Sequence, residues 1–258
     1  MMSELAAQTT ERLTQSKENW TGFLDSAAWL YKYPFHEQVL IHAQRPDATA
    51  CAPIELWNNA FKRWVNKGAK GIAIIDDSGQ KPALRYVFDV SDTNTRYNVP
   101  FSLWQTRPEY EAQIVEELQN HFGDIGVEDA DFSSAVLGIA INAVSDNYDD
   151  YKNELLKAAG NSALADMSDD EISSTFMVLL MTSVAHTVFV RLGIDPAAIF
   201  HGDEYDSISL FNSPDTIAQL GAATSDISEM VLRQIERSVR SIERQERDTL
   251  AKSSQVLQ

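Results

Sequence analysis

The most apolar part of the 258-residue chain runs from Ser168 to Gly193 and reads SDDEISSTFMVLLMTSVAHTVFVRLG. Its first four residues match a capping box, in which the side chains of Ser168 and Glu171 each accept a hydrogen bond from the other residue's backbone N–H. Gly193 is typical of the position just after a helix. The stretch therefore predicts one long helix. Polar residues interrupt its apolar run from Phe176 to Val190, whereas a membrane span needs about 20 consecutive apolar residues.

Helical patterns surround this segment from Pro108 to the end of the chain. Apart from 168–193, they predict helices over 109–122, over 132–159, over a short span after Ser213–Pro214, and over 226–252. A break is expected near Asp146–Asn147, and fraying is expected at 253–255. In the last helix, apolar residues follow one face and arginines follow the other. We therefore expect residues 108–258 to form a mainly α-helical domain.

The first 107 residues combine helices with strands. The apolar periodicity predicts helices over 13–33, 35–43 and 54–65, and strands over 71–75 and 84–90. Turn residues at 76–82 separate the two strands and predict a hairpin. In the third helix, Trp57, Phe61 and Trp64 are expected to share one face. The fold class is therefore α+β: N-terminal helices with a small antiparallel β-sheet in residues 1–107, followed by the helical domain.

The charge of the chain changes at the same boundary. The whole chain carries 21 Lys and Arg against 38 Asp and Glu, a formal net charge of −17. Residues 1–107 have 12 basic and 11 acidic residues, residues 108–206 have 3 and 20, and residues 207–258 have 6 and 7. The total argues against general coating of duplex DNA and against an anionic membrane surface. Residues 62–107, however, hold 8 basic and 4 acidic residues, so a local contact with nucleic acid is compatible with the sequence.

Common catalytic and metal-binding motifs are absent from the sequence. It contains no His-Glu-x-x-His, no Gly-x-x-x-x-Gly-Lys-Ser/Thr, no Gly-x-Gly-x-x-Gly and no Gly-x-Ser-x-Gly. The acidic groups at 146–150 and 203–206 do not have EF-hand spacing. We therefore expect no catalytic residue, no metal and no cofactor. A single cysteine, Cys51, and a start without a secretory signal predict a cytoplasmic protein with no membrane contact.

Aromatic and basic residues alternate between Trp57 and Gly71, next to the predicted hairpin with Lys81, Arg85 and Tyr86. Single-stranded nucleic acid is bound by this combination, because cations follow the backbone and aromatic faces stack on bases. The alternative is that the aromatic residues pack the helix onto the sheet while the cations face water. Composition alone favours the alternative.

Four stretches in residues 15–92 occur in a recognisable order: Trp20-Thr21-Gly22-Phe23-Leu24, YPFHEQVLIHAQRPDAT at 33–49, Trp57, and WVNKGAKGIAI at 64–74. Together they resemble the N-terminal domain of ArdC-type antirestriction proteins. The resemblance implies a single-stranded-DNA-binding domain carried on plasmids, conjugative elements and phages. One position departs from the family's pattern, since Glu37 replaces an asparagine. The residues that we predict to contact DNA are Arg45, Trp57, Lys62, Arg63, Trp64, Lys67, Lys70, Lys81 and Arg85.

The second half of ArdC-type proteins is similar to zinc metallopeptidases and carries His-Glu-x-x-His. The similar segment here is Thr182-Ser183-Val184-Ala185-His186, so Thr182 replaces a ligand and Ser183 replaces the general base. Glu229 lies where the family's downstream acidic segment would fall. One histidine and a distant carboxylate do not make a zinc site. The resemblance therefore implies a degenerate, non-catalytic relative, and a surviving metallopeptidase is the least favoured interpretation.

Two classes of function follow from these observations. The first is a non-enzymatic single-stranded-DNA-binding module that serves transfer of a mobile element or protection from restriction. The second is an acidic module whose residues 108–206 contact a host protein, or imitate the charge of DNA. The whole chain also resembles the N-terminal region of very large proteins from mobile elements of gut Firmicutes, which carry helicase and DNA-methyltransferase modules further along. That resemblance implies a leading module of a larger protein.

Overall fold

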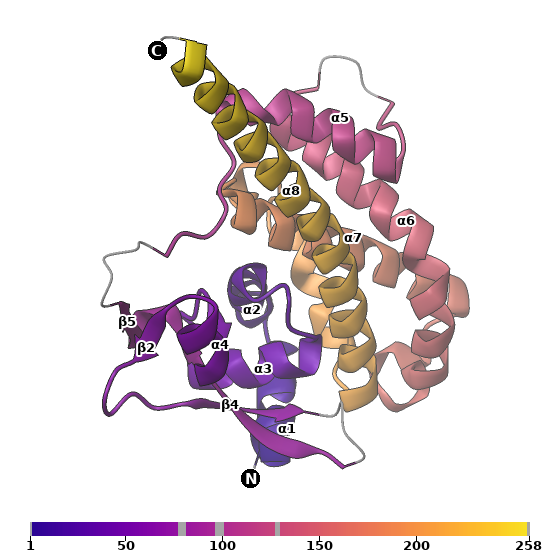
Figure 1. Cartoon of the computed structure of the whole chain (residues 1–258). Helices are drawn as coiled ribbons and strands as arrows, with labels where there is room; N and C mark the ends of the chain where they lie inside the picture. Colours follow the sequence, from indigo (N-terminus) through magenta and orange to yellow (C-terminus); the bar gives the residue numbers. More distant parts are fainter. Residues whose placement is uncertain (1, 77–80, 96–100, 127–129, 257–258) are drawn as a thin grey trace.

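The computed structural model of the chain describes residues 2–76, 81–95, 101–126 and 130–256. Within these ranges, an N-terminal part with small sheets lies against a body of long helices (Figure 1), so the predicted α+β class is confirmed. The helices are α1 (Met2–Leu13), α2 (Lys17–Trp29), α3 (Phe35–Gln44), α4 (Ile54–Asn59), α5 (Glu111–Phe122), α6 (Phe132–Ala158), α7 (Asp169–Leu192) and α8 (Pro214–Val256). The strands are β1 (Cys51–Ala52), β2 (Arg63–Val65), β3 (Ile72–Asp76), β4 (Ala83–Asp89) and β5 (Thr93–Thr95).

Helix α7 begins and ends where the sequence predicts. The Ser168 side chain accepts a hydrogen bond from the Glu171 backbone, and Glu171 Oε2 accepts one of 2.8 Å from the Ser168 backbone N–H. Gly193 follows the helix in the left-handed conformation, with a φ of 77°. By length and composition alone α7 is a candidate membrane span, but 67% of its most apolar window is buried inside the protein. Its packing against α2, α6 and α8 accounts for its apolar character.

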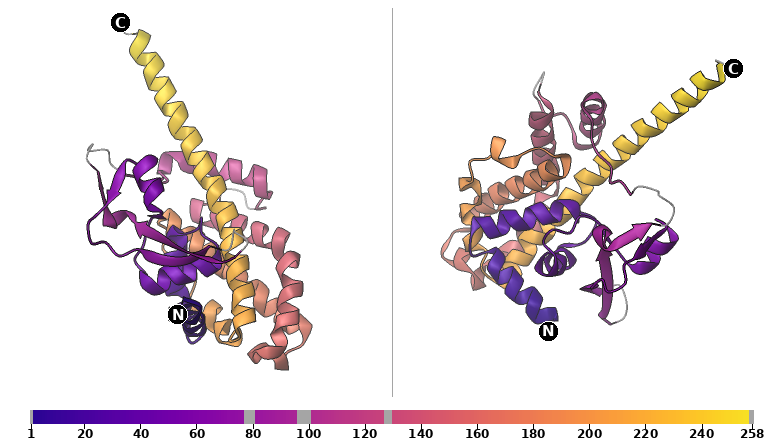
Figure 2. Two further views of the ribbon diagram at one scale, coloured as in Figure 1. Left: turned by 60° about the horizontal axis from the view of Figure 1, so that its bottom comes forward. Right: turned by 90° about the vertical axis from the view of Figure 1, so that its left-hand side faces the viewer.

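Two predicted interruptions are wrong, because α6 and α8 are both continuous. α6 passes through Asp146 and Asn147 without a break. Each of these residues costs about 0.7 kcal/mol or less in a helix, and the burial of the neighbouring Val144 and Tyr148 outweighs that cost. α8 has 43 residues, which gives a length of about 65 Å at a rise of about 1.5 Å per residue. It includes 253–255, which were expected to fray, and it projects beyond the rest of the molecule (Figure 2).

Gly221 lies within α8, where this helix packs against α3. The sequence predicted a short helix after Pro214 and a second helix from Asp226, with Gly221 between them. In the structure Gly221 lies inside α8, where an added Cβ would come within 2.3 Å of the Phe35 ring. The absent side chain therefore lets α8 approach α3 closely. This glycine serves helix packing and does not end a helix.

The helix predicted over 13–33 is present as α2, but it is shorter than predicted, because it begins at Lys17 and ends at Trp29. α1 ends at Leu13, and Ser16 caps α2 by accepting a hydrogen bond of 3.3 Å from the Asn19 backbone N–H. The sequence analysis did not predict α1. It did predict the start of α3, which follows Pro34.

Strands β3 and β4 form the predicted antiparallel hairpin. Ile72 is opposite Val87 and Asp76 is opposite Ala83, while β1 pairs with the end of β4. The order in this sheet is β1-β4-β3, so β3 lies at the edge of the sheet among the described strands. Residues 77–80 of the predicted turn lie outside the described residues. The hairpin therefore presents one face to α3 and leaves side chains of the other face exposed.

The helix predicted over 54–65 is wrong beyond Asn59. Lys62 has a φ of 53°, a left-handed conformation that ends helical geometry. The chain then continues as β2, in which Arg63 to Val65 pair with Thr93 to Thr95 of β5. Cross-strand pairing has overridden the helical periodicity. Trp64 therefore does not share a helix face with Trp57.

A single hydrophobic core joins the N-terminal part to the helical body. Trp20 and Phe23 of α2 belong to the same buried cluster as Phe176 and Phe189 of α7 and Ile227 of α8. A smaller cluster fills the space between α3 and the hairpin. The division at residue 107 stays a prediction, and helices from both sides of it contribute to the larger core. This arrangement places the N-terminal sheets beside α8.

Candidate nucleic-acid interface

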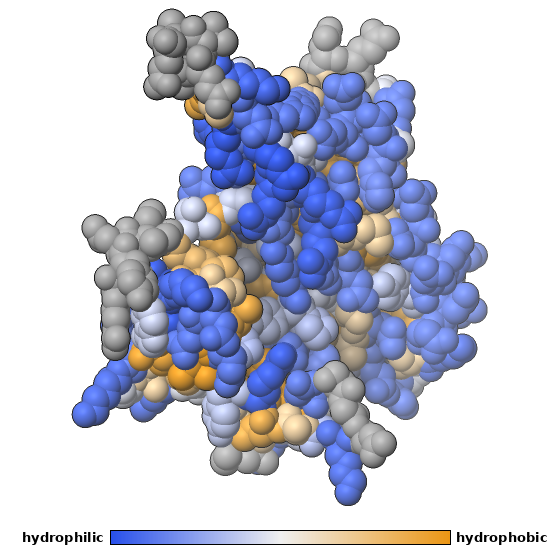
Figure 3. Space-filling model, in the orientation of Figure 1, coloured by the Kyte–Doolittle hydropathy of each residue, from blue (hydrophilic) through white to orange (hydrophobic). Residues whose placement is uncertain are grey.

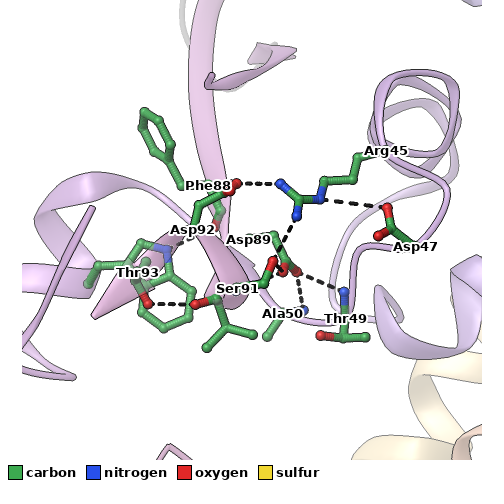
Figure 4. Close-up of polar contacts among 11 residues, drawn as sticks. Arg45, Asp47, Thr49, Ala50, Phe88, Asp89, Ser91, Asp92 and Thr93 are labelled. Atoms are coloured by element: carbon green, nitrogen blue, oxygen red, sulfur yellow. Dashed lines mark hydrogen bonds and ion pairs between the residues drawn. The ribbon is translucent and has the colours of Figure 1, made fainter. Parts of the chain in front are cut away.

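The turn after α3 contains Gln44 and Arg45, and contacts within the protein hold both side chains. The Gln44 amide donates a hydrogen bond of 2.8 Å to the Ala73 carbonyl and accepts one of 3.0 Å from the Ala73 N–H, which continues the outer edge of β3. Arg45 forms an ion pair with Asp92 and donates a hydrogen bond of 2.7 Å to Ser91 Oγ (Figure 4). Arg45, which the sequence assigned to DNA, therefore has protein partners.

Asp89 lies at the centre of the same network (Figure 4). Its buried carboxylate accepts hydrogen bonds from the backbone N–H groups of Thr49, Ala50 and Ser91 at 2.8, 3.0 and 2.9 Å, and from Ser91 Oγ at 2.6 Å. Burial tends to raise the pKa of Asp89, but the donors from Ser91, Ala50 and Thr49 outweigh burial and lower it. Asp89 thereby ties the segment before β1 to the end of β4. We name these contacts the Asp89 network.

Two further arginines predicted to contact DNA are also engaged inside the protein. Arg85 Nη2 lies 3.0 and 3.2 Å from the carboxylate oxygens of Glu37. Arg63 donates hydrogen bonds of 2.7 and 3.0 Å to the side chain and the carbonyl of Thr93. Glu37 is the position at which the chain departs from the ArdC pattern, and here it is the buried partner of Arg85. Burial raises the pKa of Glu37, and Arg85 opposes that change.

The two predicted tryptophans lie in different environments. Trp57 is 1% exposed, and its Nε1–H donates a hydrogen bond of 2.8 Å to the Phe88 carbonyl. Such a ring has no free face for a base, so its packing supports the structural alternative for this residue. Trp64 is half-buried in β2.

Four predicted lysines remain at the surface: Lys62, Lys67, Lys70 and Lys81. Within the described ranges none of them forms an ion pair. Lys70 precedes β3 and Lys81 precedes β4, so they lie at opposite ends of the hairpin. Between these ends, Leu84 and Tyr86 are 52% and 53% exposed. We refer to these four exposed residues of the hairpin, Lys70, Lys81, Leu84 and Tyr86, together as the hairpin face.

A pocket of about 300 Å³ lies where the N-terminal part meets α7 and α8. Its aromatic walls come from Trp29, Tyr31, Tyr33, Trp57, Phe61, Phe101 and Trp104. Leu56 and Phe61 at its border are 46% and 40% exposed. Figure 3 shows apolar surface on this side of the molecule, next to the hydrophilic surface of α8. We name this cavity the aromatic pocket.

Glu236 of α8 lies on the wall of the aromatic pocket and is surrounded by donors. Its carboxylate accepts hydrogen bonds of 2.7 Å from the Tyr31 hydroxyl and 2.6 Å from Arg240 Nη2, and it lies 2.6 Å from Lys32 Nζ. Burial tends to raise the pKa of Glu236, but Lys32, Tyr31 and Arg240 together lower it to about 2. We name these contacts the Glu236 network.

Arg191 of α7 lines the same pocket and is 4% exposed. Its guanidinium carbon lies 3.6 Å from the centre of the Trp104 ring and 5.0 Å from that of Trp29. Its Nη2 donates a hydrogen bond of 2.9 Å to the Trp104 carbonyl. Burial lowers the pKa of Arg191 to about 10. In the part of the chain that the structure describes, this cation has no ion pair.

A second hollow, of about 380 Å³, borders His186. His186 Nδ1 lies 2.8 Å from the Tyr205 hydroxyl, and Nε2 lies 2.9 Å from Asp25 Oδ1. Ser183 Oγ accepts a hydrogen bond of 2.9 Å from Trp20 Nε1, and Thr182 Oγ1 donates one of 2.9 Å to a backbone carbonyl of α7. The segment that resembles a zinc motif therefore makes contacts within the protein. The described residues contain no group of three or more His, Cys, Asp or Glu placed to hold a metal ion.

Several acidic residues of 108–206 serve the local backbone. Asp131, Asp195 and Asp124 each accept a hydrogen bond from a backbone N–H at a turn or helix start, Glu171 completes the capping box, and Glu204 accepts from two backbone N–H groups. Others, such as Asp149 and Asp150 on α6, are exposed. Acidic side chains at helix starts are an ordinary structural feature.

Comparisons of the chain with models of protein families, with curated proteins and with solved structures find no match. The resemblance to ArdC-type proteins therefore stays a prediction. The sequence analysis did not identify the aromatic pocket, because its residues come from distant segments: Trp29, Lys32, Trp104, Arg191, Glu236 and Arg240. The arginine face of α8 was the one signal that pointed toward it.

Proposed function

We propose that the chain binds single-stranded DNA through the hairpin face. The observation that supports this is which basic residues of the N-terminal part are engaged with other protein groups. Three arginines are engaged with protein groups, whereas Lys70 and Lys81 stay exposed on either side of Tyr86. Lysines that follow a backbone and an exposed ring that stacks on a base form a single-strand surface.

The expected strength of this surface is modest. Stacking on one aromatic ring contributes about 1–3 kcal/mol per base. For a single strand, each phosphate that the protein neutralises makes the negative slope of log affinity against log salt concentration steeper by about 0.7. Because the whole chain has a net charge of −17, long-range repulsion will weaken binding further at low salt. Affinity should therefore depend on local contacts.

Fluorescence anisotropy with a labelled single strand of about 15 nucleotides tests the proposal. Binding should weaken about tenfold in the double variant Lys70→Glu/Lys81→Glu, and by a similar factor in Tyr86→Ala, since each removes a phosphate or stacking contact. Lys157→Glu is the matched control, because it reverses one exposed charge on α6, away from the hairpin. The proposal fails if the unmodified protein binds no oligonucleotide at about 50 mM salt.

The resemblance to ArdC-type proteins extends this proposal to a role in the cell. A single-strand-binding module on a mobile element would protect entering DNA from restriction or assist its transfer. Expression of the full chain in a restriction-proficient host should raise the recovery of an incoming unmodified plasmid, and the Lys70→Glu/Lys81→Glu variant should not. The acidic alternative receives less support, because several carboxylates of 108–206 cap the local backbone.

A further inference from the structure

The aromatic pocket has the composition of a site for a flat, anionic ligand. Its walls are largely aromatic, and its volume of about 300 Å³ is at the small end of ligand-binding cavities. The charged residues that line it are Lys32, Arg191, Arg240 and Glu236. Three positive charges therefore face one negative charge in a chain whose total is strongly negative. Planar rings with an excess of cations select a planar group that carries negative charge, as a nucleotide does.

Arg191 is the strongest indication of a missing partner. A buried cation is costly unless it is paired with an anion. Among the described residues Arg191 donates to one carbonyl and lies against two tryptophan rings, and no carboxylate lies within 4.0 Å. The charge of Glu236 favours the charged form of Arg191, but Glu236 forms its ion pairs with Lys32 and Arg240. A phosphate or a base carbonyl in the pocket would supply Arg191 with an acceptor in addition to the Trp104 carbonyl.

Outside the pocket, α8 carries a stripe of exposed arginines: Arg233, Arg237, Arg240, Arg244 and Arg247. Their spacing of four and three residues alternates, so they lie along one side of the helix. Buried residues such as Ile235 and Val239 occupy the other side. Arg240 belongs both to the stripe and to the pocket wall. Arg244 and Arg247 follow Arg240 toward the C-terminal end of α8, which is the part that projects from the molecule (Figure 2).

We propose that the aromatic pocket receives one base of a bound single strand, and that Arg240, Arg244 and Arg247 contact the phosphates that follow it. This inference rests on the proposed single-strand binding and names a second contact surface for the same ligand. A strand is favoured over a free nucleotide because the exposed Arg244 and Arg247 follow Arg240 along α8 beyond the pocket, with Glu243 between Arg240 and Arg244. Arg191 and the rings of Trp29, Phe61 and Trp104 would hold the base.

The test uses the full chain and an oligonucleotide that carries 2-aminopurine, whose fluorescence falls when it stacks on aromatic rings. Phe61→Ala at the exposed border should weaken binding about five- to tenfold and restore much of the 2-aminopurine signal. Arg244→Gln/Arg247→Gln should lower the salt slope by about 1.4. Lys157→Gln is the matched control on α6. Circular dichroism shows whether each variant is folded, and the exposed positions of Arg244 and Arg247 keep the test usable if Phe61→Ala does not fold.

The outcomes separate the two proposals. If the hairpin variants weaken binding while Phe61→Ala and Arg244→Gln/Arg247→Gln bind as the unmodified protein does, the pocket inference is overturned and the proposed function stands. If no oligonucleotide binds, the proposed function fails. If a free deoxynucleoside monophosphate quenches tryptophan fluorescence as tightly as the oligonucleotide does, the ligand is a nucleotide and the strand assignment is overturned. An affinity for anionic vesicles or an acidic peptide equal to that for the strand also overturns it.

Discussion

The carboxylates of Asp89 and Glu236 are both buried, and both have a pKa below the ordinary value, but different donors hold them. Asp89 accepts from three backbone N–H groups and one hydroxyl. Glu236 accepts from Tyr31 and from the cations Lys32 and Arg240. The side chains of Lys32 and Arg240 are 45% and 62% exposed beside the aromatic pocket, so these two cations retain donors for a ligand.

The Asp89 network is structural, whereas the Glu236 network can also bind a ligand. Backbone donors fix the path of the chain and are used completely by the fold. Side-chain cations that border a cavity hold the fold together and still offer charge to a ligand. The Asp89 network therefore fixes the path of the chain around Thr49 and Ala50. The Glu236 network joins Tyr31 and Lys32 of the N-terminal part to α8 beside the aromatic pocket.

Removal of the Asp89 carboxylate should have the largest effect on stability. Asp89→Ala leaves the backbone N–H groups of the half-buried Thr49 and Ala50 and of the exposed Ser91 without their acceptor. An unsatisfied group costs about 1–3 kcal/mol when it is fully buried and less when water reaches it. Urea denaturation should show a loss of about 3 kcal/mol in the free energy of unfolding. Asp47→Ala is the control, because Asp47 is 80% exposed and lies 3.7 Å from Arg45. A loss below about 1 kcal/mol in Asp89→Ala would contradict the structural assignment.

The contact between Gly221 and Phe35 should have the next largest effect. This contact between α3 and α8 is tightly packed, whereas the aromatic pocket is open space between elements. Gly221→Ala places a Cβ 2.3 Å from the Phe35 ring, and such overpacking costs about 1–3 kcal/mol. Gly22→Ala in α2 is the matched control, since nothing lies within 4 Å of its added Cβ. This control should gain up to about 1 kcal/mol from helix propensity. Equal stabilisation of both variants in thermal denaturation would refute the packing argument.

The fold was predictable where the decisive contact is local. The capping box at Ser168 and Glu171 and the end at Gly193 involve neighbouring residues, so the sequence located α7. The role of Gly221 depends on Phe35, far away in the chain, and no local pattern indicates it. The helix over 54–65 failed for the same reason, because β2 forms by pairing with a strand that comes about thirty residues later.

The candidate site was less predictable than the fold. The sequence predicted the site in a region where basic residues exceed acidic ones, but it did not show that Arg45 and Arg85 have buried or half-buried acidic partners. Arg191 was overlooked because it is one of three basic residues in the acidic segment 108–206. Its importance comes from burial beside Trp104 and Trp29, which only the fold brings together. Composition averages charge along the chain, whereas a site depends on charge in space.

The smallest effect expected is the loss of the Glu236 ion pairs, and its dependence on pH tests whether cations hold this carboxylate. The folded pKa of Glu236, about 2, lies below the ordinary value of 4.5, so its stabilising contribution is complete above about pH 4.5 and is lost as the pH falls toward 2. Glu236→Gln should cost about 2 kcal/mol of unfolding free energy at pH 7, because Lys32 and Arg240 lose their anion. That difference from the unmodified protein should shrink as the pH is lowered from about 5 to 3, because Glu236 of the unfolded chain takes up a proton over this range while the folded carboxylate stays ionised. Urea denaturation at stepped pH measures it. A difference that stays constant down to pH 3 would mean that the cations do not interact with Glu236 as the structure indicates.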